Sequence, residues 1–249
     1  MKAFSLVLFL CLGHTVWTMS NHLYKHDWNR LILTHHWPQT LCSLEHITCS
    51  QFNYWTLHGL WTDKADMCNS SWPFDERQIE DLMPEMNKWW PDLLQSGATK
   101  FWSHEWQKHG TCAAQLEALN SEHKYFGKAL ELYKKVDLDG ILKKFNIVPS
   151  TKYYSLDEIK GTIVNFYRVK PKIQCVMPKE EEEAQTLGQI EICFDKEFQL
   201  VDCVHSKEEL SDRTDDHLTF GFHSHWEYTV CDESLQVYYP PTQKREYTL

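Results

Sequence analysis

The sequence predicts a single α+β domain in which a central antiparallel β-sheet is packed with several α-helices. Segments with helical periodicity lie in the middle of the chain, whereas segments typical of strands lie near both ends. The 249 residues, of which 42% are hydrophobic, are enough to bury one sizeable core. Because no internal repeat and no Gly/Ser-rich linker divides the chain, we expect one domain.

The expected strands are short runs of β-branched and aromatic residues. Residues 31–37, which Pro38 closes, and residues 54–61 precede the helical middle of the chain. Three further strands follow the helical middle, at residues 173–176, 188–194 and 198–203. The acidic run at 179–183 is predicted to be a solvated loop between two of them.

Three helices are expected from apolar periodicity and capping signals. Asp75 with Gln78 forms a partial capping box for a helix that runs to about Pro84. Residues 125–136 repeat apolar side chains at helical spacing, a pattern typical of a core-facing helix. Ser155 and Glu158 form a better capping box for the third helix.

The N-terminus has the organisation of a secretory signal. Lys2 precedes an apolar run at residues 3–13, and small residues suitable for cleavage follow at 18–20. We therefore expect a signal peptide at 1–20, with an approximate cleavage site, and a mature chain of residues 21–249. A membrane anchor is the alternative, but the run is too short for one, and no later stretch could span a bilayer.

The cysteine count supports export. Of nine cysteines, Cys11 lies in the predicted signal, and the remaining even number in an exported chain predicts four disulfides. Eight cysteines allow 105 pairings, so the count does not select one. Zinc binding is the rival use of cysteine, but paired CxxC spacings are missing. The eight are Cys42, Cys49, Cys68, Cys112, Cys175, Cys193, Cys203 and Cys231. A sequon at Asn69 predicts N-glycosylation on a loop.

Residues Phe101–Cys112 (FWSHEWQKHGTC) bring together the side chains that acid–base chemistry uses. On a helix, Glu105 and His109 lie four apart on one face, with Lys108 beside them and His104 on the flank. Gly110 is expected to end this helix. An ordinary surface ion pair is the simpler interpretation of the carboxylate and the ammonium, and it would contribute only about 0.2–0.5 kcal/mol.

A second segment, residues 54–61, combines a strand pattern with a histidine. Strict alternation would place His58 and Leu60 on one face, and Gly59 and Trp61 on the other. A single histidine on such a strand is more often a hydrogen-bonded core residue than a catalytic one. The two segments become informative when they are taken together.

Trp55–Trp61 (WTLHGLW) and Phe101–Cys112 closely resemble the two active-site segments of the ribonuclease T2 family, in the family's order and separation. The resemblance extends from about Trp28 to Pro241 and includes a first strand that ends in Thr34–Pro38 (THHWP). It implies the family's α+β fold and the disulfides Cys42–Cys49, Cys68–Cys112, Cys175–Cys231 and Cys193–Cys203. The length and cysteine layout fit a secreted or lysosomal animal member.

The resemblance also implies the roles of the site residues. His109 would act as general base and His58 as general acid, with Glu105 and Lys108 stabilising the charged transition state. His104 would contact phosphate. Trp61 and Asp63 would form the primary base pocket and Phe101 would help to form a second, although core packing remains a competing interpretation of Trp61 and Phe101.

The implied reaction is cleavage of single-stranded RNA with little base preference, through a 2′,3′-cyclic phosphate to a 3′-phosphate, without metal or cofactor. DNA has no 2′-hydroxyl, so we expect it to be inert. We expect a monomer without a membrane span, which passes through the endoplasmic reticulum to the lysosome or the outside.

The formal net charge of −10 is unusual for a protein that binds RNA. Thirteen histidines remain after the predicted signal, and near pH 5 most would carry a positive charge. We therefore expect RNA binding to be favoured in an acidic compartment.

Three other interpretations remain at this point. A zinc hydrolase could use His104, Glu105 and His109, but these histidines are five apart, about 140° around an α-helix, rather than four. A binding or signalling protein of the same fold could act independently of catalysis. His223 and His225, in a histidine-rich segment at 205–226, are a lone pair and indicate metal binding only poorly.

Overall fold

The computed structural model of the chain describes residues 28–64, 66–95, 99–180, 182–203 and 228–242. The predicted signal peptide, the histidine-rich segment 205–226 and the polar C-terminal tail after residue 242 lie outside the described residues.

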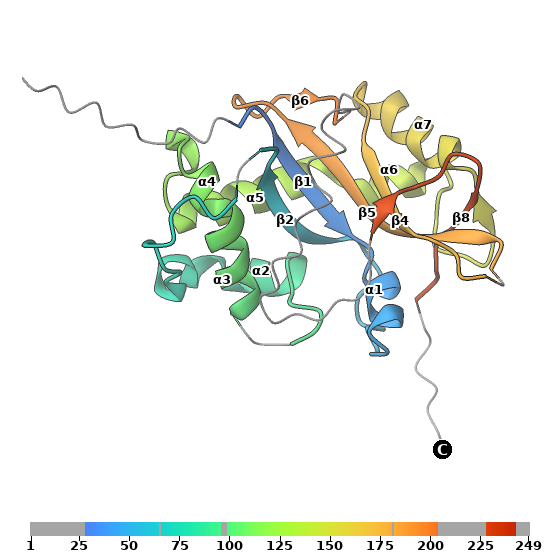
Figure 1. Cartoon of the computed structure of the whole chain (residues 1–249), viewed down its shortest axis with the longest axis horizontal. Helices are drawn as coiled ribbons and strands as arrows, with labels where there is room; N and C mark the ends of the chain where they lie inside the picture. Colours follow the sequence, from blue (N-terminus) through green and yellow to red (C-terminus); the bar gives the residue numbers. More distant parts are fainter. Residues whose placement is uncertain (1–27, 65, 96–98, 181, 204–227, 243–249) are drawn as a thin grey trace, which may run out of the picture.

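One mixed sheet forms the centre of the molecule (Figure 1). Its main path runs β2 (Thr56–Thr62), β1 (Leu31–His36), β5 (Ala184–Phe194), β4 (Lys172–Val176) and β7 (Thr229–Val230). The pairs along this path are antiparallel, as predicted. Short strands extend the sheet: β6 (Leu200–Val201) pairs with β5, and β8 (Gln236–Tyr238) pairs with β3 (Tyr153–Tyr154) and, in parallel, with β5.

Strand β2 is irregular at the predicted catalytic histidine. Thr34 of β1 pairs with Gly59 of β2, but the next residue, His35, pairs with Leu57. His58 is therefore an extra residue, a β-bulge, on β2. A bulge adds one residue to one strand only and so changes which side chains share a face beyond that point.

The alternation expected for residues 54–61 is therefore wrong beyond Leu57. Leu57 and Leu60 are both buried in the core, whereas His58 and Trp61 are partly exposed with their ring centroids 5.0 Å apart. Because of the bulge, the His58 side chain lies on the same face of β2 as Trp61 rather than on the opposite face.

Apart from α1, which lies below the end of β1, the labelled helices lie in two groups around the sheet (Figure 1). In Figure 1, α2 to α5 lie beside or behind the β2 edge, while α6 and α7 lie toward β4 and β8. The helical elements are α1 (Pro38–Leu44), η1 (Glu76–Leu82), α2 (Met83–Trp89), α3 (Lys100–Glu105), η2 (Trp106–Gly110), α4 (Thr111–Ala113), η3 (Glu117–Leu119), α5 (Glu122–Val136), α6 (Leu138–Lys144) and α7 (Leu156–Tyr167). None of the helices that the structure describes combines the length and apolar character that a membrane crossing requires.

Two helix predictions are confirmed and one is corrected. Helix α5 covers the apolar stripe, and both hydrogen bonds of the Ser155–Glu158 capping box form at the start of α7. The segment after Asp75 is a 3₁₀-helix, not an α-helix, and Pro84 lies in the first turn of α2 instead of ending the preceding helix. Proline lacks a backbone N–H, and the first turn of a helix is where that N–H has no partner to lose.

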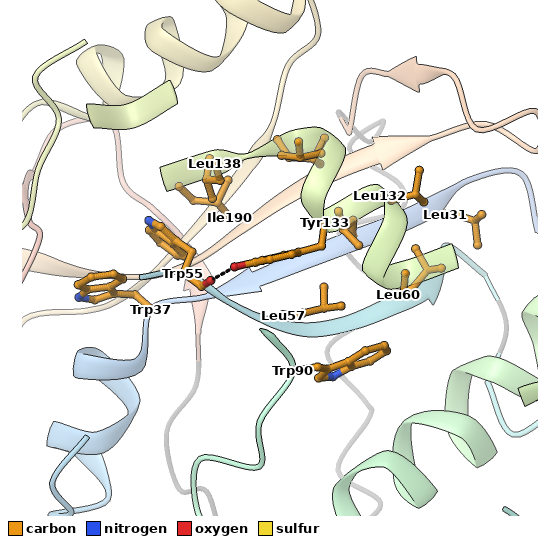
Figure 2. Packing of buried hydrophobic residues seen from close by; sticks show 14 of the residues in the cluster. Leu31, Trp37, Trp55, Leu57, Leu60, Trp90, Leu132, Tyr133, Leu138 and Ile190 are labelled. Atoms are coloured by element: carbon orange, nitrogen blue, oxygen red, sulfur yellow. Dashed lines mark hydrogen bonds between the residues drawn. The ribbon is translucent and has the colours of Figure 1, made fainter. Parts of the chain in front are cut away.

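Trp55 anchors the start of β2 in the core. Its backbone N–H donates to both carboxylate oxygens of Asp139 at 3.1 Å. Its carbonyl accepts from the Tyr133 hydroxyl at 2.5 Å (Figure 2). Its indole N–H donates to the Tyr239 hydroxyl at 2.8 Å. These bonds tie β2 to α5 and α6 and so fix where the strand enters the sheet.

The bulge itself receives a separate hydrogen bond at His58. Trp90, just after α2, donates its indole N–H to the His58 carbonyl at 2.7 Å. The Trp90 carbonyl in turn accepts from the Trp102 indole of α3 at 2.8 Å. This chain of bonds links α3 to the backbone of His58.

The eight cysteines form the four bridges Cys42–Cys49, Cys68–Cys112, Cys175–Cys231 and Cys193–Cys203. This is the pairing that the family resemblance implies. Cys68–Cys112 joins the loop after β2 to α4, at the end of the helical segment that carries His104 to His109.

Replacing both Cys68 and Cys112 by alanine should lower the free energy of unfolding by about 3–4 kcal/mol, because the bridge closes a span of 44 residues. Urea unfolding of the variant and the wild type would measure the difference. The Cys193→Ala/Cys203→Ala variant, which opens a span of only 10 residues, is the matched comparison. An equal loss in both variants would contradict an effect that depends on span.

Candidate active site

The predicted catalytic helix runs past Gly110 and comprises α3, the π-turn η2 and α4. The expectation that Gly110 ends it is wrong, since this glycine has helical angles of φ −59° and ψ −41°. A Cβ atom at Gly110 would lie 2.3 Å from the Trp106 ring. The glycine therefore permits close packing inside the helix instead of terminating it.

The π-turn changes the relation between His104 and His109. It replaces i→i+4 with i→i+5 hydrogen bonds, so residues five apart lie closer to one face than in an α-helix. The separation of about 140° expected for these histidines therefore does not apply. No group of three or more His, Cys, Asp and Glu side chains in the described ranges is arranged to hold a metal ion.

The Trp61 ring joins the two predicted segments. The Trp61 and His58 rings meet in a T-shaped contact at a centroid distance of 5.0 Å, and the Trp61 ring stacks with that of His109 at 5.2 Å and an interplanar angle of 30°. Its indole N–H donates to Glu105 Oε2 at 2.9 Å. The strand histidine, the helix histidine and the carboxyl group thus converge on one side chain.

Glu105 is buried and bonded to Trp61. It is only 2% exposed, and a Cβ atom at Gly59 would lie 2.3 Å from Glu105 Oε2, so a larger residue at position 59 would displace the carboxyl group. Burial raises the pKa of Glu105 to about 8, although the bond from Trp61 and the charge of Lys108 act in the opposite direction. Glu105 is therefore protonated at acid pH and can donate a hydrogen bond.

The pKa of His58 is shifted in the opposite direction, to a lower value. Its Nδ1 lies 2.9 Å from Gln189 Oε1 on β5. Burial lowers the pKa of His58 to about 4; the Gln189 bond opposes this shift, and the charges of His104 and Lys108 add to it. For His104, burial and Lys108 also lower the pKa.

Of the other predicted residues, Phe101 lies at the site, whereas Asp63 and Asn69 lie in the chain after β2. The Phe101 ring stacks with His58 at 5.9 Å and 28°, so it lies at the site. Asp63 Oδ1 accepts a hydrogen bond from the Asn29 backbone at 2.8 Å and thus fixes the chain after β2. Asn69, the predicted glycosylation position, lies in the loop after Cys68, where its side chain accepts bonds from Ser71.

Three residues at the site were not expected from the sequence: Gln189, His36 and Tyr228. The His36 ring lies 5.1 Å from that of His58, and its Nε2 lies 3.0 Å from the Tyr228 hydroxyl. Burial, with the nearby His58, lowers the pKa of His36 well below its usual value. A histidine and a glutamine on otherwise apolar strands were the available signal, but only strand pairing shows that they meet.

The family model described as the ribonuclease T2 family matches residues 28–203. The chain belongs to the ribonuclease T2 family. It is 54% identical over 217 residues to ribonuclease T2 of Danio rerio, covering 87% of this chain and 89% of that one. It is 44% identical over 242 residues to ribonuclease T2 of Homo sapiens, covering 96% of this chain and 93% of that one.

Solved structures agree with this assignment. The crystal structure of human RNase T2 matches with a TM-score of 0.72 and 42% identity, covering 87% of this chain and all of that one. RNase MC1 from bitter gourd seeds, a more distant relative at 28% identity, matches with a TM-score of 0.63. The predicted family and fold class are therefore confirmed.

This ribonuclease T2 family member also has a cavity of about 600 Å³ that neither His58 nor His109 lines. Tyr54, Trp89, Tyr133 and Asp139 are among its lining residues, so it lies near the start of β2 and the end of α5. None of the predicted site residues lines it. Its size does not make it the reaction site, because its lining includes none of the side chains that converge on Trp61.

Replacing Glu105 by glutamine should change how stability depends on pH. A carboxyl group whose pKa is raised on folding stabilises the protein below its unfolded pKa of about 4.5, and this contribution is lost as the pH rises through about 8. The wild type should therefore lose about 5–10 °C in Tm, relative to Glu105→Gln, between pH 5 and pH 8.

Thermal unfolding at several pH values measures this, with Glu131→Gln at an exposed position of α5 as the control. A constant difference in Tm between the wild type and Glu105→Gln from pH 5 to pH 8 would contradict a buried, protonated carboxyl group.

Proposed function

We propose that this chain is an acid endoribonuclease that cleaves single-stranded RNA with little base specificity through a pair of histidines. As a member of the ribonuclease T2 family, it is an RNA-cleaving endoribonuclease. The finer proposal concerns its mechanism and conditions. The observation that carries it is the convergence of His58, His109 and Glu105 on Trp61.

RNA contains its own nucleophile, the ribose 2′-hydroxyl. His109 removes its proton, the 2′-oxygen attacks the phosphorus, and His58 protonates the departing 5′-oxygen. The product is a 2′,3′-cyclic phosphate. The roles of the two histidines then reverse, and water opens the ring to a 3′-phosphate. This chemistry requires neither a metal ion nor a cofactor.

The environment of the site favours this reaction at acid pH. His58 must be protonated to act as an acid, and burial disfavours that charge in the free protein. A bound phosphodiester, being negative, raises the pKa of His58 again. Glu105, protonated under the same conditions, donates a hydrogen bond to the crowded transition state, and Lys108 supplies a fixed positive charge.

Base binding depends on aromatic faces and therefore tolerates any base. Trp61 already uses one face and its N–H within the protein, so a base would stack on its other face. Asp63 lies two residues beyond, and the Phe101 ring beside His58 offers a second platform. In this proposal His104 contacts phosphate. Little base preference is the consequence.

We also propose that the protein acts in the lysosomal lumen or outside the cell. The predicted signal and four disulfides support secretion or delivery to the lysosomal lumen through the endoplasmic reticulum. An acidic lumen would also charge the histidines of a chain with net charge −10, which favours RNA binding. We propose that the mature protein acts as a monomer and leaves DNA intact.

Replacing either His58 or His109 by alanine should lower RNA cleavage at pH 5 by at least about 10³-fold, because one proton transfer is lost. Purified wild type, both variants and His123→Ala, a control at an exposed histidine of α5, would be incubated with RNA and with DNA at pH 5 and pH 8 in EDTA. Mass spectrometry would identify the product ends.

The wild type and the control should cleave RNA faster at pH 5, leave DNA intact and release cyclic phosphates. Near-full activity of either folded active-site variant would refute the mechanism. A wild type that binds RNA but does not cleave it would favour a binding or signalling role.

Lys108→Ala should lower kcat by about 10- to 100-fold through the loss of transition-state charge. Since the charge of Lys108 lowers the pKa of His58, its removal should also move the alkaline limb of the pH–rate profile to higher pH. Lys108→Arg, which keeps the charge, should retain most activity, and Lys135→Ala on the exposed side of α5 is the control. An unchanged kcat in Lys108→Ala would exclude this lysine from the mechanism.

A further inference from the structure

We propose that Gln189 is a positioning residue for His58: its side-chain carbonyl accepts the Nδ1 proton and thereby aims the Nε2 atom at the substrate. This inference deepens the proposed function and rests on it, since it assigns a residue through which the acid–base histidine is oriented.

Gln189 reaches His58 because of the sheet order. Strand β1 lies between β2 and β5, and His36 of β1 is the direct register partner of Gln189. The bulge on β2 brings the His58 ring over to His36, at 5.1 Å. Gln189 Oε1 then lies 2.9 Å from His58 Nδ1. Three adjacent strands thus contribute one side chain each to a row.

The position of Gln189 is set by a second irregularity. The β4–β5 register shifts so that Gln174 pairs with Gln189 and Cys175 pairs with Leu187, which leaves Gly188 as an extra residue. A Cβ atom at Gly188 would lie 2.1 Å from the Tyr228 ring. A bulge often re-aims the side chain next to it, and here the neighbour is Gln189.

Tyr228 contacts the middle member of this row, His36. Packed against Gly188, it places its hydroxyl 3.0 Å from His36 Nε2. This hydrogen bond to Nε2 holds His36 beside the His58 ring. Gln189 is 4% exposed and His36 is 6% exposed, so water does not readily take the place of either side chain.

The chemistry of an amide decides the tautomer. The Oε1 atom of glutamine only accepts hydrogen bonds, so the Nδ1 atom of neutral His58 carries the proton. The Nε2 atom then has the lone pair in the neutral form and gains the proton when the ring is charged. A histidine that exchanges a proton with substrate needs this one nitrogen, and its orienting partner selects it.

An amide also differs from a carboxylate in charge. The amide bonds the ring but carries no negative charge, so it does not stabilise the protonated imidazolium form of His58 as a carboxylate would. The other groups that face this ring are His36 from β1 and, from the α3–η2 helix, the cationic Lys108 together with His104. Gln189 is accordingly the partner that can orient His58 while leaving it free to lose its proton.

The tautomer can be measured without RNA. In two-bond ¹H–¹⁵N correlation spectra of the ¹⁵N-labelled mature protein at pH 7, the His58 ring should show a protonated Nδ1 and an unprotonated Nε2. The His58→Ala variant identifies its signals. A protonated Nε2 would overturn the proposal, whatever the activity of the protein. Failure to cleave RNA with the expected tautomer present would instead refute the proposed function.

Two substitutions test the consequence for catalysis on a single-stranded RNA oligonucleotide. Gln189→Leu should lower kcat by about 10- to 100-fold with KM changed less than about 3-fold, because the ring loses its orienting partner. Since the Gln189 bond raises the pKa of His58, the alkaline limb should move to lower pH. Gln189→Glu should retain orientation and move the limb to higher pH by about one unit, because a carboxylate stabilises the imidazolium.

The control is Gln185→Leu, another buried amide of β5, which bonds the backbone at Asp232 and Leu235 and not His58. It should lower Tm without moving the pH profile. Shifts of the same sign in Gln189→Leu and Gln189→Glu, or profiles that match that of the control, would overturn the proposal. The NMR measurement on the wild type decides the question if either variant fails to fold.

Discussion

The β-bulge at His58 is the constraint on which the rest of the site depends. In a regular strand, His58 and Trp61 would point to opposite faces of the sheet, and the strand histidine would lie in the core with Leu60. One extra residue reverses that arrangement while Leu57 and Leu60 remain buried. At the bulge, the Trp90 indole N–H donates a hydrogen bond to the His58 carbonyl and so satisfies it.

Burial acts on the two key titratable groups in opposite directions and for the same reason. Taking a group out of water disfavours its charged form, so the pKa of Glu105 rises to about 8 while that of His58 falls to about 4. The free site therefore carries little negative charge of its own beside Lys108. In the proposed mechanism, a phosphodiester that enters the site would meet a cation and hydrogen-bond donors instead of a competing carboxylate.

The tryptophans serve as more than apolar bulk. Irregular backbone leaves carbonyl groups without sheet or helix partners, and a buried carbonyl without a partner is costly. Indole N–H groups supply those partners here: Trp90 bonds His58, Trp102 bonds Trp90, and Trp28 bonds Cys112 at 3.1 Å. An aromatic core thus supports a bulge, a loop and a helix end around the site.

The sequence by itself determined the fold class, the family, the pairing implied for the cysteines and the two segments that meet at the site. Local signals carried these inferences: the capping box at Ser155, the apolar stripe of α5, and an unusual density of polar groups around His58 and His109. Tertiary structure alone decided the bulge, the π-turn through Gly110, and the meeting of Gln189 with His58 across β1. Each of these depends on strand register or side-chain packing between segments distant in sequence, and neither periodicity nor spacing along one segment contains that information.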